Sequence, residues 1–246
     1  MSAAKVQLPV LNNINDRIHS LNWPEIHASL HKFGWARTGE ILTPEECGAL
    51  RDLYADENRF RSKIVMARHR FGLGEYKYFA YPLPEDVVDL RESLYSHLVE
   101  VANEWARQLG LGINYPETHR EFVRQCHQKG QKRPTPLLLR YERNGYNCLH
   151  QDLYGEIYFP LQTVFLLDQP ERDFEGGEFV LVEQRPRAQS SAQVIAPRQG
   201  EAVIFTTRWR PVSGTRGHYR VNIKHGVSTV TRGQRHTLGI VYHDAE

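Results

Sequence analysis

Apolar and polar positions alternate mostly at helical spacing over the first 130 or so residues. Between 85 and 109 the apolar side chains recur at steps of three and four residues and stop at Gly110, which predicts the longest helix of the chain. The spacing over 14–33 also indicates helix. The run Thr43-Pro44-Glu45-Glu46 supplies an N-cap threonine, a proline at the first helical position and a glutamate at the third, so a helix is predicted over 44–55.

The pattern becomes strand-like after residue 134. Short runs rich in β-branched and aromatic residues, separated by turn residues, occupy 137–142, 158–167, 178–183, 193–196, 201–206, 219–231 and 235–242. Strands that follow one another without helices predict a sandwich or jelly roll rather than a parallel sheet. We therefore expect an α+β, mainly β protein with one domain over 1–246, in which 1–133 is helix-rich, with strands interposed at 63–81, and 134–246 forms the β core.

Composition limits the classes of protein to consider. The chain has 246 residues, of which 40% are hydrophobic and 24% charged, and none of its apolar runs approaches the roughly 20 residues that cross a bilayer. The amino terminus lacks the apolar core of a secretory signal, so we expect a cytoplasmic protein without a membrane partner. Cys47, Cys126 and Cys148 form no CxxC pair, which argues against a disulfide framework or a thiolate zinc site.

Two short motifs could contribute metal ligands. His150-Gln151-Asp152 is an H-x-D, and His119-Arg120-Glu121 is an H-x-E in a charged, helix-like stretch. About one such match is expected by chance in a chain of this composition. The context favours His150 and Asp152, because they follow a predicted strand and a turn at Gly145, and alternate side chains of an extended segment project to one face.

A third ligand is available from the late β-segment that contains His225. Two imidazoles and one carboxylate on one face of an octahedron leave open positions, as non-haem Fe(II) requires, whereas zinc prefers four tetrahedral ligands. His218, His236 and His243 are rival candidates on the same stretch.

Arg235 favours His225 over these rivals. It follows His225 by ten residues, across a turn at Gly233. If 225–231 and 235–241 pair as a hairpin, His225 and Arg235 face one pocket, and Thr237 shares the face of Arg235. A guanidinium at that place would bind a carboxylate in bidentate fashion, with a hydroxyl beside it.

These residues resemble the prolyl-hydroxylase-like branch of the 2-oxoglutarate and Fe(II)-dependent oxygenases. The resemblance covers roughly 137–246. Its motifs are Tyr141 and Gly145 ahead of His150-x-Asp152, the run 163–168, Gly176-Gly177-Glu178, the run 200–205, His225-Gly-Val and the run from Arg235 to Asp244. It implies a double-stranded β-helix, a form of jelly roll, packed on amino-terminal helices.

The resemblance also implies roles for individual residues. His150, Asp152 and His225 would bind Fe(II), and Arg235 would bind the distal carboxylate of 2-oxoglutarate, with Tyr141 and Thr237 at supporting positions. The implied reaction uses O₂ and 2-oxoglutarate to oxidise a C–H bond of the substrate.

The substrate stays open at this point. Basic clusters at 59–70 and 208–224 would suit the phosphates of damaged DNA, and a protein side chain is equally compatible with the resemblance. Two other interpretations compete: a non-catalytic nucleic-acid-binding β-sandwich, and a cupin-like metalloenzyme that would not need Arg235.

Overall fold

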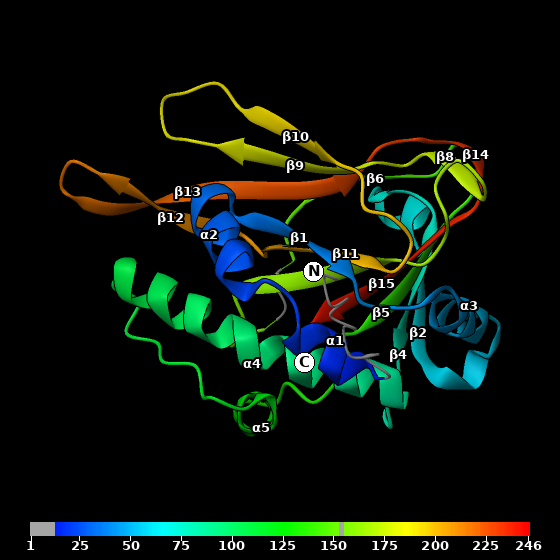
Figure 1. Cartoon of the computed structure of the whole chain (residues 1–246), viewed down its shortest axis with the longest axis horizontal. Coiled ribbons are helices and arrows are strands. Elements are labelled where there is room, and N and C mark those ends of the chain that lie inside the picture. Colours follow the sequence, from blue (N-terminus) through cyan, green and yellow to red (C-terminus); the bar gives the residue numbers. More distant parts are fainter. Residues whose placement is uncertain (1–12, 153–154) are drawn as a thin grey trace, which may run out of the picture.

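The computed structural model describes residues 13–152 and 155–246, and in this part of the chain two antiparallel sheets face each other as a jelly roll (Figure 1). The amino-terminal residues 1–12, on which the expectation about a secretory signal largely rests, lie outside the described residues. The mainly β architecture and its jelly-roll core agree with the fold predicted from the sequence.

The larger sheet runs through the middle of the molecule. Its order is β1 (Trp35–Glu40), β11 (Glu201–Thr206), β7 (Leu161–Leu166), β15 (Arg235–Val241), β5 (Leu137–Tyr141), β4 (Glu75–Phe79) and β2 (Phe60–Val65). One face of this sheet packs on helices and the other faces the second sheet. On β11, Ile204 joins the core shared with the helices, whereas Val203 and Phe205 join a cluster with residues of the second sheet, as strand alternation requires.

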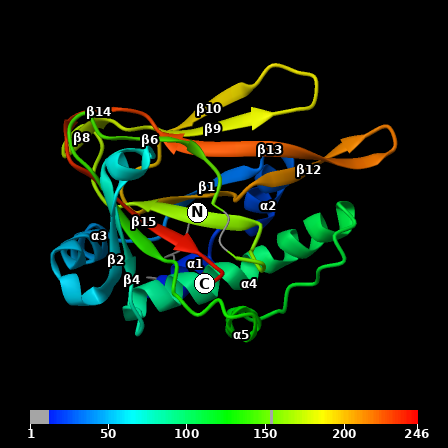
Figure 2. The same cartoon turned by 180° about the vertical axis from the view of Figure 1, so that it is seen from behind.

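The smaller sheet covers the inner face of the larger one. Its order is β10 (Ser191–Ile195), β9 (Phe179–Gln184), β13 (Gly217–Val227), β6 (Tyr146–His150) and β3 (Gly72–Leu73), with β12 (Trp209–Gly214) also paired to β13. A separate pair consists of β8 (Phe174–Gly176) and β14 (Val230–Gly233). The hairpins β9–β10 and β12–β13 extend beyond the sandwich at one end (Figures 1 and 2).

The helices lie on the side of the larger sheet away from the smaller one (Figures 1 and 2). They are α1 (Ile14–His19), α2 (Trp23–Phe33), α3 (Pro44–Asp52), α4 (Glu85–Gln108) and α5 (His119–Gln128), with 3-10 turns η1 (Leu53–Ala55) and η2 (Glu57–Arg59). A further 3-10 turn, η3 (Met66–His69), contacts β3 of the smaller sheet instead. The predicted long helix is confirmed, and Thr43 and Glu46 form the expected capping box. No helix in the described segments is long and apolar enough to cross a membrane.

Two sequence-based expectations are wrong. The single strand expected over 219–231 is broken at 228–229, where Ser228 donates its N–H to Glu178 O and the chain leaves the smaller sheet. The hairpin expected between 225–231 and 235–241 does not form either. β13 pairs with β9, β6 and β12 in the smaller sheet, while β15 pairs with β5 and β7 in the larger one. The segment between His225 and Arg235 therefore crosses from one sheet to the other.

Candidate metal centre

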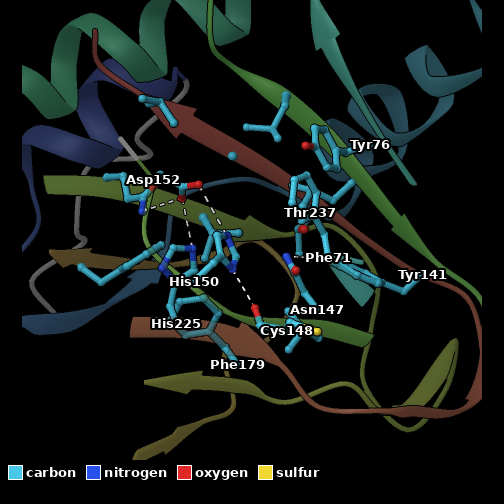
Figure 3. A pocket seen from close by; sticks show the side chains of 18 of the residues that line it. Phe71, Tyr76, Tyr141, Asn147, Cys148, His150, Asp152, Phe179, His225 and Thr237 are labelled. Atoms are coloured by element: carbon cyan, nitrogen blue, oxygen red, sulfur yellow. Dashed lines mark hydrogen bonds and ion pairs between the residues drawn. The ribbon is translucent and has the colours of Figure 1, made fainter. Parts of the chain in front are cut away.

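His150, Asp152 and His225 meet on the inner face of the smaller sheet. One ligand atom from each lies within 4.8 Å of the other two, and no further His, Cys, Asp or Glu joins this group in the described residues. His225 Nε2 is 3.1 Å from Asp152 Oδ2, and His150 Nε2 is 3.5 Å from Asp152 Oδ1. Figure 3 shows the three side chains converging.

Strand pairing explains this convergence. His150 is the last residue of β6 and lies opposite His225 in the register of β6 with β13, so both rings project to the same face. The ring centroids are 4.2 Å apart. Asp152 lies two residues beyond His150 and returns to that face. Gln151, between them, points the other way, and its Nε2 donates to the carbonyls of Arg208 and Ile223, each at 2.9 Å.

Neighbouring groups orient the three side chains. His150 Nδ1 is 2.8 Å from Cys148 O, which leaves Nε2 directed towards Asp152. Gln162 Nε2, from β7 of the opposite sheet, donates to Asp152 Oδ2 at 2.9 Å. Burial alone would raise the pKa of Asp152, but His225 and His150 outweigh it and hold that pKa well below its usual value. Burial lowers the pKa of His225. An ionised carboxylate beside a neutral imidazole is a donor set suited to a cation.

The rival histidines lie elsewhere. His218 is exposed near the tip of the β12–β13 hairpin, and His236 is hydrogen-bonded through Nδ1 to Asp168 at 2.8 Å. His243 is buried and accepts a hydrogen bond from the Phe159 N–H. His119, of the second short motif, begins α5 and contacts Tyr242 O through Nε2 at 2.8 Å. Only His225 among the candidates joins His150 and Asp152.

A cavity of about 420 Å³ opens beside the three residues, between the two sheets. Phe179, Phe205 and Val227 contribute apolar surface to it. Arg235, the first residue of β15, enters the same cavity from the opposite sheet. The interpretation that His225 and Arg235 share one pocket thus agrees with the structure, although the two residues reach it across the sandwich and not along one hairpin.

The guanidinium of Arg235 is buried without an anion. The residue is 2% exposed, its Nε and Nη1 have no hydrogen-bond partner, and burial lowers its pKa. The rings of Tyr141 and Phe174 lie 5.7 and 5.9 Å from its Cζ. The absence of a side chain at Gly177 provides the space for Arg235, because a Cβ at position 177 would lie 2.8 Å from Arg235 Cδ. Unpaired donors in a dry site favour the binding of an anionic group.

The supporting positions also line this cavity. Thr237 follows Arg235 by two residues on β15 and is buried, as predicted by strand alternation. The Tyr141 hydroxyl accepts a hydrogen bond from Asn147 Nδ2 at 3.3 Å, and burial raises the pKa of Tyr141 to about 12, so the phenol keeps its proton. Sequence reasoning missed Gln162 and Asn147. Gln162 is a polar residue on a buried strand that is mostly apolar, and a single sequence gives only a weak signal of this kind.

Comparison with known proteins places the chain in a family. A family model named Oxygenase-NA, described as an oxygenase catalysing oxidative methylation of damaged DNA, matches residues 74–245. An uncharacterised protein of Mycobacterium tuberculosis is 45% identical over 167 residues, which cover 68% of this chain and 72% of that protein. The jelly roll is like that of prolyl hydroxylases, and the matching family model defines the chain as an oxygenase. The chain belongs to the Oxygenase-NA family.

Solved structures support the fold. A prolyl-4-hydroxylase from Pseudomonas putida superimposes with a TM-score of 0.52 at 15% identity, over 91% of this chain and 99% of that one. A prolyl hydroxylase from Trichoplax adhaerens, in complex with a hypoxia inducible factor peptide fragment, gives 0.53 at 14% identity over 90% and 89%. A prolyl 4-hydroxylase from Phytophthora capsici gives 0.56 at 16% identity over 97% and 68%. The prediction of an oxygenase and the predicted prolyl-hydroxylase-like fold are confirmed.

Proposed function

We propose that this oxygenase depends on Fe(II) and 2-oxoglutarate, with His150, Asp152 and His225 as the iron ligands and Arg235 as the residue that binds the distal carboxylate of 2-oxoglutarate. The observation that carries the proposal is the buried guanidinium of Arg235 without an anionic partner, in the same cavity as the His-Asp-His group. A cupin-like metalloenzyme that does not bind an oxoacid would not need the Arg235 guanidinium in its cavity.

The residues fit both cofactors. Two imidazole nitrogens and one carboxylate on one side of a metal leave positions for a chelating keto acid and for O₂. 2-Oxoglutarate carries a second carboxylate at its other end, which matches the forked donors of Arg235. Bound together, Fe(II), 2-oxoglutarate and O₂ supply the oxidation of a C–H bond, with 2-oxoglutarate converted to succinate and CO₂.

The protein's own residues bind, orient and exclude water. Gln162 and the Cys148 carbonyl fix the orientations of Asp152 and His150. The Thr237 hydroxyl lies beside Arg235 and is available to a bound carboxylate. Phe179 and Phe205 enclose His225, with ring centroids 5.9 and 4.7 Å away, and keep water from the metal face of the cavity.

For the substrate we propose methylated, damaged nucleic acid. The family description names damaged DNA, and this favours nucleic acid over the protein side chain that the prolyl-hydroxylase-like fold would equally accommodate. Hydroxylation of an N-methyl group leaves an unstable N–CH₂OH that releases formaldehyde, so this chemistry removes a methyl group from a base.

We further propose that 1–246 acts as one domain, which is supported by a core cluster that combines α4 with β7, β11 and β15.

The metal assignment is tested by titrating the purified protein with Mn(II) as a redox-stable surrogate for Fe(II). We expect one bound ion in the wild type and loss of tight binding in His150→Ala, Asp152→Ala and His225→Ala, because each removes one of three ligands. His218→Ala, an exposed histidine outside the group, is the matched control. Unchanged stoichiometry in all three ligand variants would refute the site.

The reaction is tested with a methylated oligonucleotide, Fe(II), 2-oxoglutarate and O₂. We expect succinate and formaldehyde in equal amounts, and neither product from the Asp152→Ala variant. Succinate formed without formaldehyde, together with hydroxylation of a peptide, would retain the cofactor assignment and reject nucleic acid as substrate.

A further inference from the structure

The cavity beside the His-Asp-His group opens to solvent at one edge of the sandwich. Four of its lining residues are exposed: Arg70 and Phe71 from the turn before β3, and Cys148 and Leu149 from β6. The turn lies along β6, because the Phe71 carbonyl accepts the Cys148 N–H at 2.8 Å. The mouth of the cavity is therefore between this edge of the smaller sheet and the strands of the larger sheet that face it.

The larger sheet supplies a part of the cavity wall that the oxoacid does not need. Arg235, proposed to bind the oxoacid, is on β15. β5 separates β15 from β4, where Tyr76 lies opposite Leu139. Tyr78 lies opposite Leu137 in the same pairing. Both tyrosines line the cavity from a strand two positions, or about 10 Å, away from β15, so this wall is available to the substrate (Figure 3).

Three aromatic rings line the part of the cavity near the mouth. Tyr76 and Tyr78 project to one face of β4, with ring centroids 5.4 Å apart and planes at 87°. The Cζ of Arg61 lies 4.5 Å from the centroid of the Tyr78 ring and covers it from one side. Phe71 stacks on the His69 ring at 5.3 Å and 22°, yet it is 48% exposed, so its other face is open to a ligand.

The charges at the mouth favour an anionic ligand. Asp152 is the one carboxylate among the described residues that line the cavity, and it is a proposed metal ligand. Arg70 is exposed beside Phe71, and Arg68 is exposed two residues earlier. A nucleotide combines a flat ring that stacks on aromatic side chains with a phosphate that binds arginine. A proline residue in a peptide has neither group.

We propose that Phe71, Tyr76 and Tyr78 bind the methylated base by stacking, and that Arg70 binds a phosphate of the same strand. The base lies between these rings and the His-Asp-His group, with its methyl group directed towards the metal ligands. A base in a duplex is stacked on its neighbours, so it has to leave the stack to reach this site. The inference rests on the proposed function, because it takes methylated nucleic acid as the substrate.

The test measures binding of a short, fluorescein-labelled oligothymidine that contains one N-methylated adenine, by fluorescence anisotropy. The protein is loaded with Mn(II) and 2-oxoglutarate, so that the base is bound but not oxidised. Phe71→Ala and Tyr78→Leu should each weaken binding about tenfold or more, because each removes a stacking ring. Tyr78→Phe retains the ring and should keep most of the affinity that Tyr78→Leu loses. Phe33→Ala, an exposed phenylalanine that does not line the cavity, is the matched control.

A second comparison distinguishes a nucleic-acid strand from a free nucleoside, which carries the same base. The methylated nucleoside should bind more weakly than the oligonucleotide and should also lose affinity in Phe71→Ala. Arg70→Ala should weaken oligonucleotide binding and lower the slope of log affinity against log salt by about 0.7, while nucleoside binding stays unchanged. Equal affinities of the wild type for nucleoside and oligonucleotide would overturn the assignment of a phosphate to Arg70.

Wild-type affinity for the oligonucleotide in both Phe71→Ala and Tyr78→Leu would overturn the stacking site, as would binding of a proline-containing peptide in place of the oligonucleotide. A Mn(II) titration of each variant shows that its metal site is intact. Failure of the proposed cofactor use is recognised separately, because the wild type would then not bind 2-oxoglutarate. If the wild type binds 2-oxoglutarate, Phe71→Ala should bind it equally well, since Phe71 is not on the strand of Arg235.

Discussion

Replacing Arg235 by methionine removes the one feature that distinguishes a 2-oxoglutarate enzyme from other proteins with the same metal ligands. Methionine fills a similar volume without a charge, whereas Arg235→Lys keeps a charge but loses the planar fork. The proposed metal ligands lie on the side of the opposite sheet, so both variants should bind Mn(II) as the wild type does.

The expected magnitude comes from the state of the guanidinium. It is buried, has no hydrogen-bond partner at Nε or Nη1, and would gain charge-assisted bonds from a carboxylate. Hydrogen bonds to a charged group contribute about 1.5–3 kcal/mol, which corresponds to roughly a ten- to hundred-fold change in affinity. Arg235→Met should therefore need at least ten times more 2-oxoglutarate, and Arg235→Lys should fall between it and the wild type.

Two assays measure this effect. Calorimetric titration of the Mn(II)-loaded proteins gives the affinity for 2-oxoglutarate. Thermal unfolding with and without 2-oxoglutarate gives the stabilisation by the ligand, which is about 2.7 kcal/mol at a concentration one hundred times Kd. Without ligand, Arg235→Met should unfold at a temperature no lower than wild type, because an unpaired buried charge has been removed. If 2-oxoglutarate stabilises Arg235→Met as much as wild type, Arg235 does not bind it.

Two other predictions concern the support of the site and the response to pH. Gln162→Leu should weaken Mn(II) binding about ten- to hundred-fold, because it removes the hydrogen bond that orients Asp152. The control Gln193→Leu, at an exposed position of β10, should bind Mn(II) as the wild type does. Equal Mn(II) affinities of the two variants would contradict this. Burial lowers the pKa of His119 from 6.5 to about 3, so between these values the unfolded chain binds a proton that the folded chain does not. Its contribution to stability is complete above pH 6.5 and is lost as the pH falls towards 3. His119→Gln should therefore lose less free energy of unfolding than wild type between about pH 7 and pH 5 in urea denaturation, and identical losses would refute this.

The local signals in the sequence predicted local structure well. The capping box at Thr43 and the apolar spacing of α4 depend on residues close together in the chain, and both are present in the structure. His150 and Asp152 come together for the same reason, because strand alternation places positions two apart on one face.

The pairing of distant segments could not be derived in this way. A turn at Gly233 between two β-segments is compatible with a hairpin, but the hydrophobic pattern does not say whether the segments pair with each other or lie in facing sheets. The strand β12 and the edge strand β1 were also missed. β12 contains Pro211, and β1 ends in the exposed residues Gly39 and Glu40.

The crossing between His225 and Arg235 has a consequence for how this chain tolerates changes in length. The segment 228–234 spans the sandwich and is held by the pairing of β14 with β8, so an insertion there would move Arg235 away from the His-Asp-His group. The tip of the β12–β13 hairpin, at Gly214 to Gly217, projects beyond both sheets (Figure 1). Added residues there would alter neither the metal ligands nor Arg235, which makes that tip the place to attach a tag or a reporter without disturbing the site.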